Sequence, residues 1–247
     1  MQTKPKFEIT SMSLHLLAMA LMLCDHLWGT VIPGNEWLTC IGRISFPIFA
    51  FMIVEGYFHT KNIKKYVLRL LTFAVISEIP FNLMLGGRLF YPIHQNVLWS
   101  FLISIALIHL NEKAKNRKKV WLTILVALST VLIGALLGLL LMVDFYHAGI
   151  LTVLVFYFFR HKKWWCYPCQ LLLLFYINTE LIGGLGYNVD LFGHTFFILQ
   201  QTFALLALIP IWLYRGKQGY HSKALKYLYY AFYPAHMLIL AIIKLLG

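Results

Sequence analysis

Asp25 and His26 stand side by side near the end of an apolar stretch of membrane-spanning length, "LHLLAMALMLCDHLWGTVI" at residues 14–32. A histidine can act as a general base or as a nucleophile, because it titrates near neutral pH. Ionisable side chains in a spanning helix are costly, and they usually face a cavity or a partner. Adjacent residues of a helix point about 100° apart, so neither side chain can orient the other directly. We therefore expect each of the two to need a partner from another helix.

Further polar side chains occur at several depths of the other apolar stretches, and they are the candidates to assist His26. The groups expected to orient His26 or to carry its proton are Asp25, Glu55 and Glu78. The groups expected to donate hydrogen bonds to a developing oxyanion are Asn96, Tyr233 and His236. His15 precedes His26 by 11 residues, about three turns and roughly 16 Å of helix, so both lie on nearly one face.

The composition identifies the surroundings of these residues as a bilayer. The chain of 247 residues is 60% hydrophobic and 12% charged, whereas a soluble domain is about 25% charged. We expect an all-α, polytopic integral membrane protein with about nine spanning helices (eight or ten also fit), because backbone groups in lipid must be satisfied within the segment. The expected helices are 13–32, 43–60, 66–86, 95–111, 119–142, 147–160, 164–183, 195–214 and 226–246. No linker or clear repeat interrupts them, so one domain is expected to fill residues 1–247.

The positive charges alternate between the hydrophilic breaks, and this pattern predicts the orientation of the chain. Breaks rich in Lys and Arg, such as 113–119, alternate with breaks that have few or none, such as 33–42 and the one around Asp190. The positive-inside rule then places the N-terminus in the cytoplasm and the C-terminus outside. The net charge of +12 is therefore mostly topological. Nucleic-acid binding is excluded, because the basic residues are spread over separate helix ends with no folded domain behind them.

The stretch "GRISFPIFAFMIVEGYFHTKNIKKYVLRLLTFAVISEIPFNLM", residues 42–84, resembles the TraX family, named for the conjugative F-pilin acetylase. The likeness extends to the Asp25–His26 pair, "HQNVLWSFLISI" (94–105), "YHAGILTVLVFYFFR" (146–160) and "KYLYYAFYPAHMLIL" (226–240), and so covers nearly the whole chain. The family is grouped with the transmembrane acyltransferases, which pass acetyl groups from cytoplasmic acetyl-CoA to acceptors across the membrane. The resemblance implies that activity here, in the cytoplasmic membrane of a bacterium.

Those acyltransferases carry a basic residue, ten intervening residues and a histidine held to be catalytic, and His15 and His26 reproduce the spacing. The resemblance thus implies a catalytic His26, with His15 standing where relatives usually have Lys or Arg. Acetyl-CoA is the expected donor substrate, and no metal is predicted. The phosphates of the donor suit basic residues at the cytoplasmic mouth. The residues expected to hold donor or acceptor are His15, Arg43, Lys61, Lys65, Arg69, Asn96, Tyr233 and His236, with Lys226 sharing the basic mouth.

Two other classes of protein remain open at this point. In a proton- or ion-coupled transporter, Asp25, Glu55, Glu78 and His236 would form a relay through the membrane. In an assembly or scaffold protein, the same residues would be structural polar pairs. The acceptor is likewise open, since a glycan hydroxyl, an amino sugar and a peptide amine would all meet the same base. The oligomeric state cannot be read from the sequence.

Overall fold

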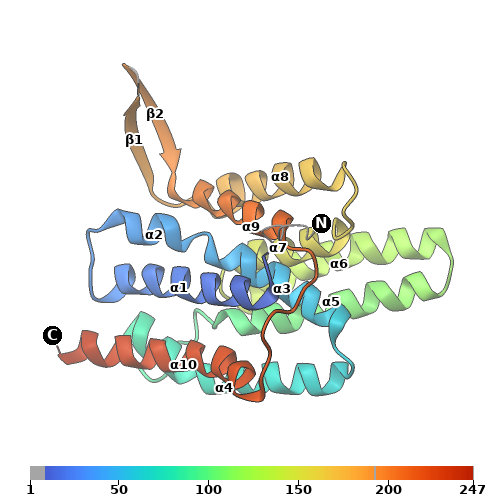
Figure 1. Cartoon of the computed structure of the whole chain (residues 1–247), viewed down its shortest axis with the longest axis horizontal. Helices are drawn as coiled ribbons and strands as arrows, with labels where there is room; N and C mark the ends of the chain where they lie inside the picture. Colours follow the sequence, from blue (N-terminus) through green and yellow to red (C-terminus); the bar gives the residue numbers. More distant parts are fainter. Residues whose placement is uncertain (1–8, 192, 247) are drawn as a thin grey trace, which may run out of the picture.

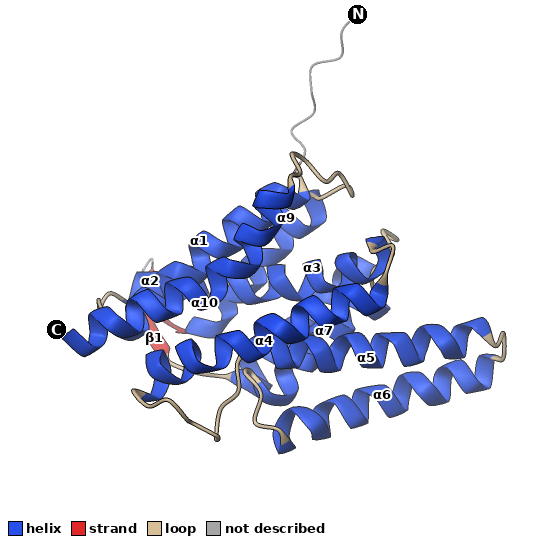
Figure 2. Ribbon diagram, turned by 90° about the horizontal axis from the view of Figure 1, so that it is seen from below, coloured by secondary structure: helices blue, strands red, loops and turns tan. Residues whose placement is uncertain are grey.

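The computed structural model describes residues 9–191 and 193–246, and it is mostly helical (Figure 1). Most helices run roughly parallel to one long axis, and α5 and α6 extend beyond the others at one end (Figure 2). The helices are α1 (Ser11–Thr30), α2 (Glu36–Gly42), α3 (Ser45–His59), α4 (Ile63–Gly86), α5 (Val97–Asn116), α6 (Val120–Leu140), α7 (Tyr146–Phe158), α8 (Cys166–Tyr176), α9 (Leu208–Leu213) and α10 (Lys223–Leu246). A π-helical segment, η1 (Ile177–Ile182), continues α8, and a 3-10 segment, η2 (Gln200–Ala207), precedes α9.

In the part of the chain that the structure describes, six helical segments are long and apolar enough to cross a membrane. They are Ser11–Thr30, Glu36–His59, Ile63–Gly86, Val97–Asn116, Val120–Leu140 and Lys223–Leu246. Three further apolar helices, Tyr146–Phe158, Cys166–Ile182 and Gln200–Leu213, are shorter. A membrane of about 30 Å needs about 20 helical residues, so the predicted count of nine spans stays a prediction for these three segments. Lys4 and Lys6, which contribute to the predicted orientation, lie outside the described residues.

The structure is mostly helical, as expected for an all-α membrane protein, and it departs from that expectation in one hairpin. Residues 186–199, which include the start of the expected helix 195–214, form an antiparallel hairpin of β1 (Gly186–Leu191) and β2 (His194–Leu199). Tyr187, Val189 and the aromatic and branched residues 196–198 favour extended backbone, and Gly193 supplies the positive φ that the turn needs. The hairpin projects from the bundle (Figure 1). The expected hydrophilic break 33–42 is also largely helical, since α2 occupies residues 36–42.

The helices differ in how much of their surface is buried, because they differ in how many other helices pack around them. Most of α7 is buried, including Ile150, Leu154 and Phe156, and it packs against α3, α5 and α6. A helix that is apolar all round and buried on most faces belongs at the centre of a bundle. In contrast, α6 buries only Thr130, Gly134 and Gly138, and leaves its other faces for lipid.

A second apolar cluster joins α10 to α4 and α1. Its buried residues are Phe81, Met84, Tyr233, Met237, Leu240 and Ala241, with Met22, Leu23 and Leu27 of α1 packed against them. Side chains of Phe81, Met84 and Tyr233 also reach a cavity in the bundle. This cluster therefore sets the position of α10 relative to α1, and with it the site described next.

Candidate functional site

A cavity of about 290 Å³ lies among α1, α3, α4, α5 and α10 and the connections 87–96 and 141–145. Its lining is mainly apolar, with contributions from Phe46, Phe81, Phe101 and Tyr233. The ionisable side chains that reach it are Asp25, His26, Arg43, His94, Asp144 and Lys244. An apolar pocket with a few convergent polar groups is the usual form of a small-molecule site.

His26 of α1 is held by His236 of α10. Nδ1 of His26 lies 2.7 Å from Nε2 of His236, and the two rings stack with centroids 4.9 Å apart. Nδ1 of His236 lies 2.6 Å from the carbonyl oxygen of Phe232. A carbonyl only accepts, so Nδ1 of His236 is the donor and its Nε2 carries the lone pair of a neutral ring. Nδ1–H of His26 therefore donates to His236.

This arrangement leaves Nε2 of His26 with a free lone pair. Within residues 9–191 and 193–246, Nε2 of His26 makes no hydrogen bond, and it is not among the fully buried polar atoms. His26 lines the cavity, whereas the ring of His236 is only 5% exposed. The pair thus consists of an outer histidine with one open nitrogen and an inner histidine that determines its tautomer.

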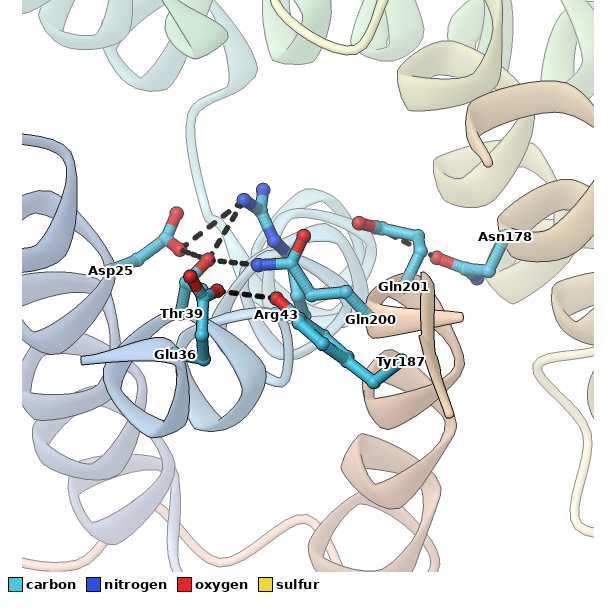
Figure 3. A network of polar contacts seen from close by, with 8 residues as sticks. All are labelled: Asp25, Glu36, Thr39, Arg43, Asn178, Tyr187, Gln200 and Gln201. Carbon is cyan, nitrogen blue, oxygen red and sulfur yellow. Dashed lines mark hydrogen bonds and ion pairs between the residues drawn. The ribbon is translucent and has the colours of Figure 1, made fainter. Parts of the chain in front are cut away.

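Asp25 contacts other residues than His26 does, because adjacent residues of a helix point in different directions. Its Oδ1 accepts from Thr39 Oγ1 at 2.7 Å and lies 3.5 Å from Arg43 Nη2, which donates to Thr39 at 3.0 Å (Figure 3). The approach of α2 depends on Gly42, where a Cβ would stand 2.4 Å from Asp25 Cβ. The expectation that Asp25 and His26 take partners from different helices is confirmed.

The Asp25 network continues to the hairpin. Gln200 Nε2 donates to Thr39, and Tyr187 of β1 donates to Glu36 of α2 (Figure 3). Burial and the Glu36 carboxylate raise the pKa of Tyr187 to about 12, so its hydroxyl remains a donor at neutral pH. Asp25 is therefore part of a polar network that ties α1 to α2 and the hairpin, and it does not hydrogen-bond His26.

A second histidine reaches the cavity from the connection between α4 and α5. His94 Nε2 lies 3.0 Å from Oδ1 of Asp144, which also accepts from the backbone N–H of Phe145 at 3.1 Å. The two connections are joined by backbone hydrogen bonds, from Gln95 to Met142 and from Asp144 to Gln95, both 2.8 Å. This His94–Asp144 pair was not among the predicted site residues. A signal for His94 was available, because His94 opens the family-like stretch 94–105, whereas nothing in the sequence singled out Asp144.

Several predicted residues lie away from the cavity. Glu55 accepts from Arg160 Nε at 2.7 Å. It does not line the cavity, which α3 reaches through Ser45, Phe46 and Phe49, and it has no hydrogen bond to His26. Glu78 Oε2 accepts from Asn96 Nδ2 and from Trp99 Nε1. Asn96 is fully buried and caps α5. Neither Glu78 nor Asn96 lines the cavity, and their contacts join α4 to α5.

The predicted donor-binding residues come from neighbouring helices at the other end of α1. The ring of His15 stacks on Tyr229 of α10 at 4.2 Å, and its Nδ1 contacts the carbonyl oxygen of Ser11. Arg69 of α4 is half-buried, and its Nε has no hydrogen bond within the described part of the chain. Lys61 and Lys65 are exposed at the start of α4. Arg43, Tyr233 and His236 instead belong to the cavity region.

The fold and the site together define a class of protein. The chain is a bundle with helices able to span a membrane, enclosing a cavity with histidine pairs. Among the residues that the structure describes, no group of three or more His, Cys, Asp or Glu side chains is placed to hold a metal ion. The features are those of a polytopic membrane protein with a polar site inside the bundle.

The comparisons with known proteins then give the family. The model of the TraX protein family matches residues 11–244, so the chain belongs to the TraX family. The chain is also similar to a protein of Dichelobacter nodosus described as "Probable fimbrial assembly protein FimC, serogroup H1". The two are 26% identical over 265 aligned positions, which cover 96% of this chain and 97% of the relative. No solved structure matches.

Proposed function

We propose that the protein is a membrane-embedded acetyltransferase that moves an acetyl group from cytoplasmic acetyl-CoA to an amine or hydroxyl of an acceptor outside the cytoplasm. The single observation that carries the proposal is the open Nε2 of His26 in a mainly apolar cavity, with its tautomer set by His236. Such an atom can act as the base or the nucleophile of acyl transfer. Membership of the TraX family supports the same reaction class. The name of the relative supports an acceptor connected with fimbriae.

The basic end of the bundle fits the donor by its chemistry. The head group of acetyl-CoA carries phosphates, and an Arg side chain with unused donors is suited to bind them. Arg69 Nε and Tyr229 Oη are buried without a hydrogen-bond partner among the described residues, and the helices that carry them, α4 and α10, pack together. Lys61, Lys65 and Lys226 add positive charge at the same end. The head group would bind there and its flexible arm would run along α1, from His15 toward His26.

The His26 side chain is expected to act on the acetyl group directly. His236 would receive the Nδ1 proton of His26 through their 2.7 Å contact when Nε2 bonds to carbon or to a proton. Tyr233 of α10 lines the cavity, and its hydroxyl would donate a hydrogen bond to an oxyanion there. Arg43 and Lys244 also reach the cavity and would stabilise negative charge there.

The test is acetyl-CoA turnover by the purified protein in nanodiscs, measured as release of free CoA. We expect slow hydrolysis by the wild type and a loss of about 10³-fold or more in His26→Ala, with acetyl-CoA binding retained. His59→Ala is the matched control, because His59 is an exposed histidine at the basic end of α3. Acetyl-CoA binding that is absent from a folded wild-type protein would favour a proton- or ion-coupled transporter.

A further inference from the structure

The cavity contains a second histidine, and its environment differs from that of His26. His26 is hydrogen-bonded to a neutral histidine, whereas His94 is hydrogen-bonded to the carboxylate of Asp144. Both rings line the same cavity. In each, one nitrogen is engaged and the other makes no hydrogen bond within the described residues and is not fully buried. Two histidines that each have one open nitrogen therefore line the same cavity.

The geometry determines which nitrogen of His94 is open. The Asp144 carboxylate accepts, so Nε2 of a neutral His94 is the donor and Nδ1 carries the lone pair. A histidine whose second nitrogen is bound by a carboxylate is the usual form of a general base, because the carboxylate stabilises the imidazolium that forms on proton uptake. The Asp144 side chain is itself fixed by the N–H of Phe145. The ring of His94 is therefore held in place before any substrate binds.

His26 lacks such a bonded carboxylate. Its engaged nitrogen contacts the neutral ring of His236. The two histidines therefore differ in their bonded partner, which is a neutral ring for His26 and a carboxylate for His94. A neutral, tautomer-fixed imidazole is suited to attack carbon, since its lone pair stays available.

We propose that the two pairs divide the reaction, with His26 as the nucleophile that carries the acetyl group and His94, positioned by Asp144, as the base that activates the acceptor. This inference rests on the proposed acetyltransferase function. In the first half, Nε2 of His26 forms a bond to the thioester carbon, the C–S bond breaks, and its electron pair leaves with the CoA sulfur. The Nδ1 proton of His26 passes to Nε2 of His236, which leaves a neutral acetyl-imidazole.

In the second half, the acceptor X–H loses its proton to Nδ1 of His94. The X atom bonds to the acetyl carbon, and the bond to Nε2 of His26 breaks with its electron pair returning to the imidazole. Nδ1 of His26 then regains its proton from His236. The proton on His94 leaves to water and balances the thiolate released in the first half. Acetyl-CoA and X–H are thereby converted to acetyl-X and CoA.

The experiment compares two acceptors that differ in their need for a base. Water must lose a proton to attack, whereas hydroxylamine is already neutral and nucleophilic near neutral pH. Protein in nanodiscs receives acetyl-CoA, with or without hydroxylamine, and free CoA and acetohydroxamate are measured. His94→Gln is expected to lower hydrolysis about 10²-fold and to leave acetohydroxamate formation within about threefold of wild type. Asp144→Asn should give the same selectivity with a smaller loss, and His59→Gln serves as the control.

The other variants and outcomes separate this inference from the proposed function. His26→Gln should lose both reactions, because no acetyl-enzyme forms. If His94→Gln hydrolyses acetyl-CoA as fast as wild type, or loses both reactions in equal proportion while folded, the assignment of His94 is wrong and the acetyltransferase proposal stands. If wild-type protein releases no more CoA than protein-free nanodiscs, which report the direct reaction of hydroxylamine with the thioester, the proposed function fails, and the inference fails with it.

Discussion

The two ends of the bundle use ionisable residues in different ways. At the basic end, Glu55 accepts from Arg160, whose guanidinium also lies over the ring of Phe58 at 4.2 Å. Glu112 there accepts from Tyr157 at 2.7 Å and from Lys115 at 2.9 Å. In the cavity, the contacts of His26 and His94 instead leave one nitrogen of each ring open.

The difference shows how a polar side chain in a membrane bundle can be assigned to structure or to chemistry. A residue whose polar atoms bind oppositely charged neighbours fixes the relation between helices, and removing it leaves an unpaired group. A residue that is oriented through one atom and open at another is prepared to act on a ligand. By this criterion Glu55, which pairs with Arg160, has the form of a structural residue, while His26 and His94 have the form expected of functional residues.

The largest effect that would sharpen this comparison is expected at His236. His236→Ala should lower kcat for acetyl-CoA hydrolysis by about 10²-fold with little change in KM, because the tautomer of His26 is no longer fixed. His236→Gln offers an amide oxygen to Nδ1–H of His26 and should recover part of the loss. A variant His236→Gln that is as slow as His236→Ala, with both folded, would mean that the contact does not orient His26.

A smaller effect is expected at the basic end of the donor path. Arg69→Ala should raise the KM for acetyl-CoA about tenfold and leave kcat within about twofold, since a lost phosphate contact is made equally in ground and transition states. Arg69→Lys keeps the charge and should lie between the two. Steady-state rates over a range of acetyl-CoA concentrations measure this. A fall in kcat at constant KM would mean that Arg69 acts in the chemical step. The basic end would then not be limited to structure and donor binding.

The smallest effect on turnover is expected at Glu55. Glu55→Gln removes the charge that pairs with Arg160, and it should lower the free energy of unfolding by about 1–3 kcal/mol while turnover stays within about twofold. Unfolding in detergent, followed by tryptophan fluorescence, measures the first quantity, and CoA release measures the second. Loss of turnover at unchanged stability would instead support the relay role considered for Glu55 from the sequence.

Much of the fold was accessible from the amino-acid sequence, and the misses have physical causes. Six of the expected spans coincide with long apolar helices, because apolar runs of this length are helical in any membrane protein. The segment 195–199 was misassigned as helix, since its apolar residues fit a span as well as a strand, and pairing with β1 decides between them. In the candidate site, His26 and His236 were both named, but as separate groups.

The sequence by itself determined the membrane class and the family, and it identified Asp25 and His26 as candidate functional residues, because composition and local motifs are properties of the chain. Only the tertiary structure decided which residues meet. His26 meets His236 across 210 positions of the chain, and His94 meets Asp144 across 50. Such pairs depend on how α1 packs against α10 and on how two connections join through the backbone of Gln95. Helical periodicity specifies the face on which a side chain lies, whereas helix packing specifies what lies opposite it.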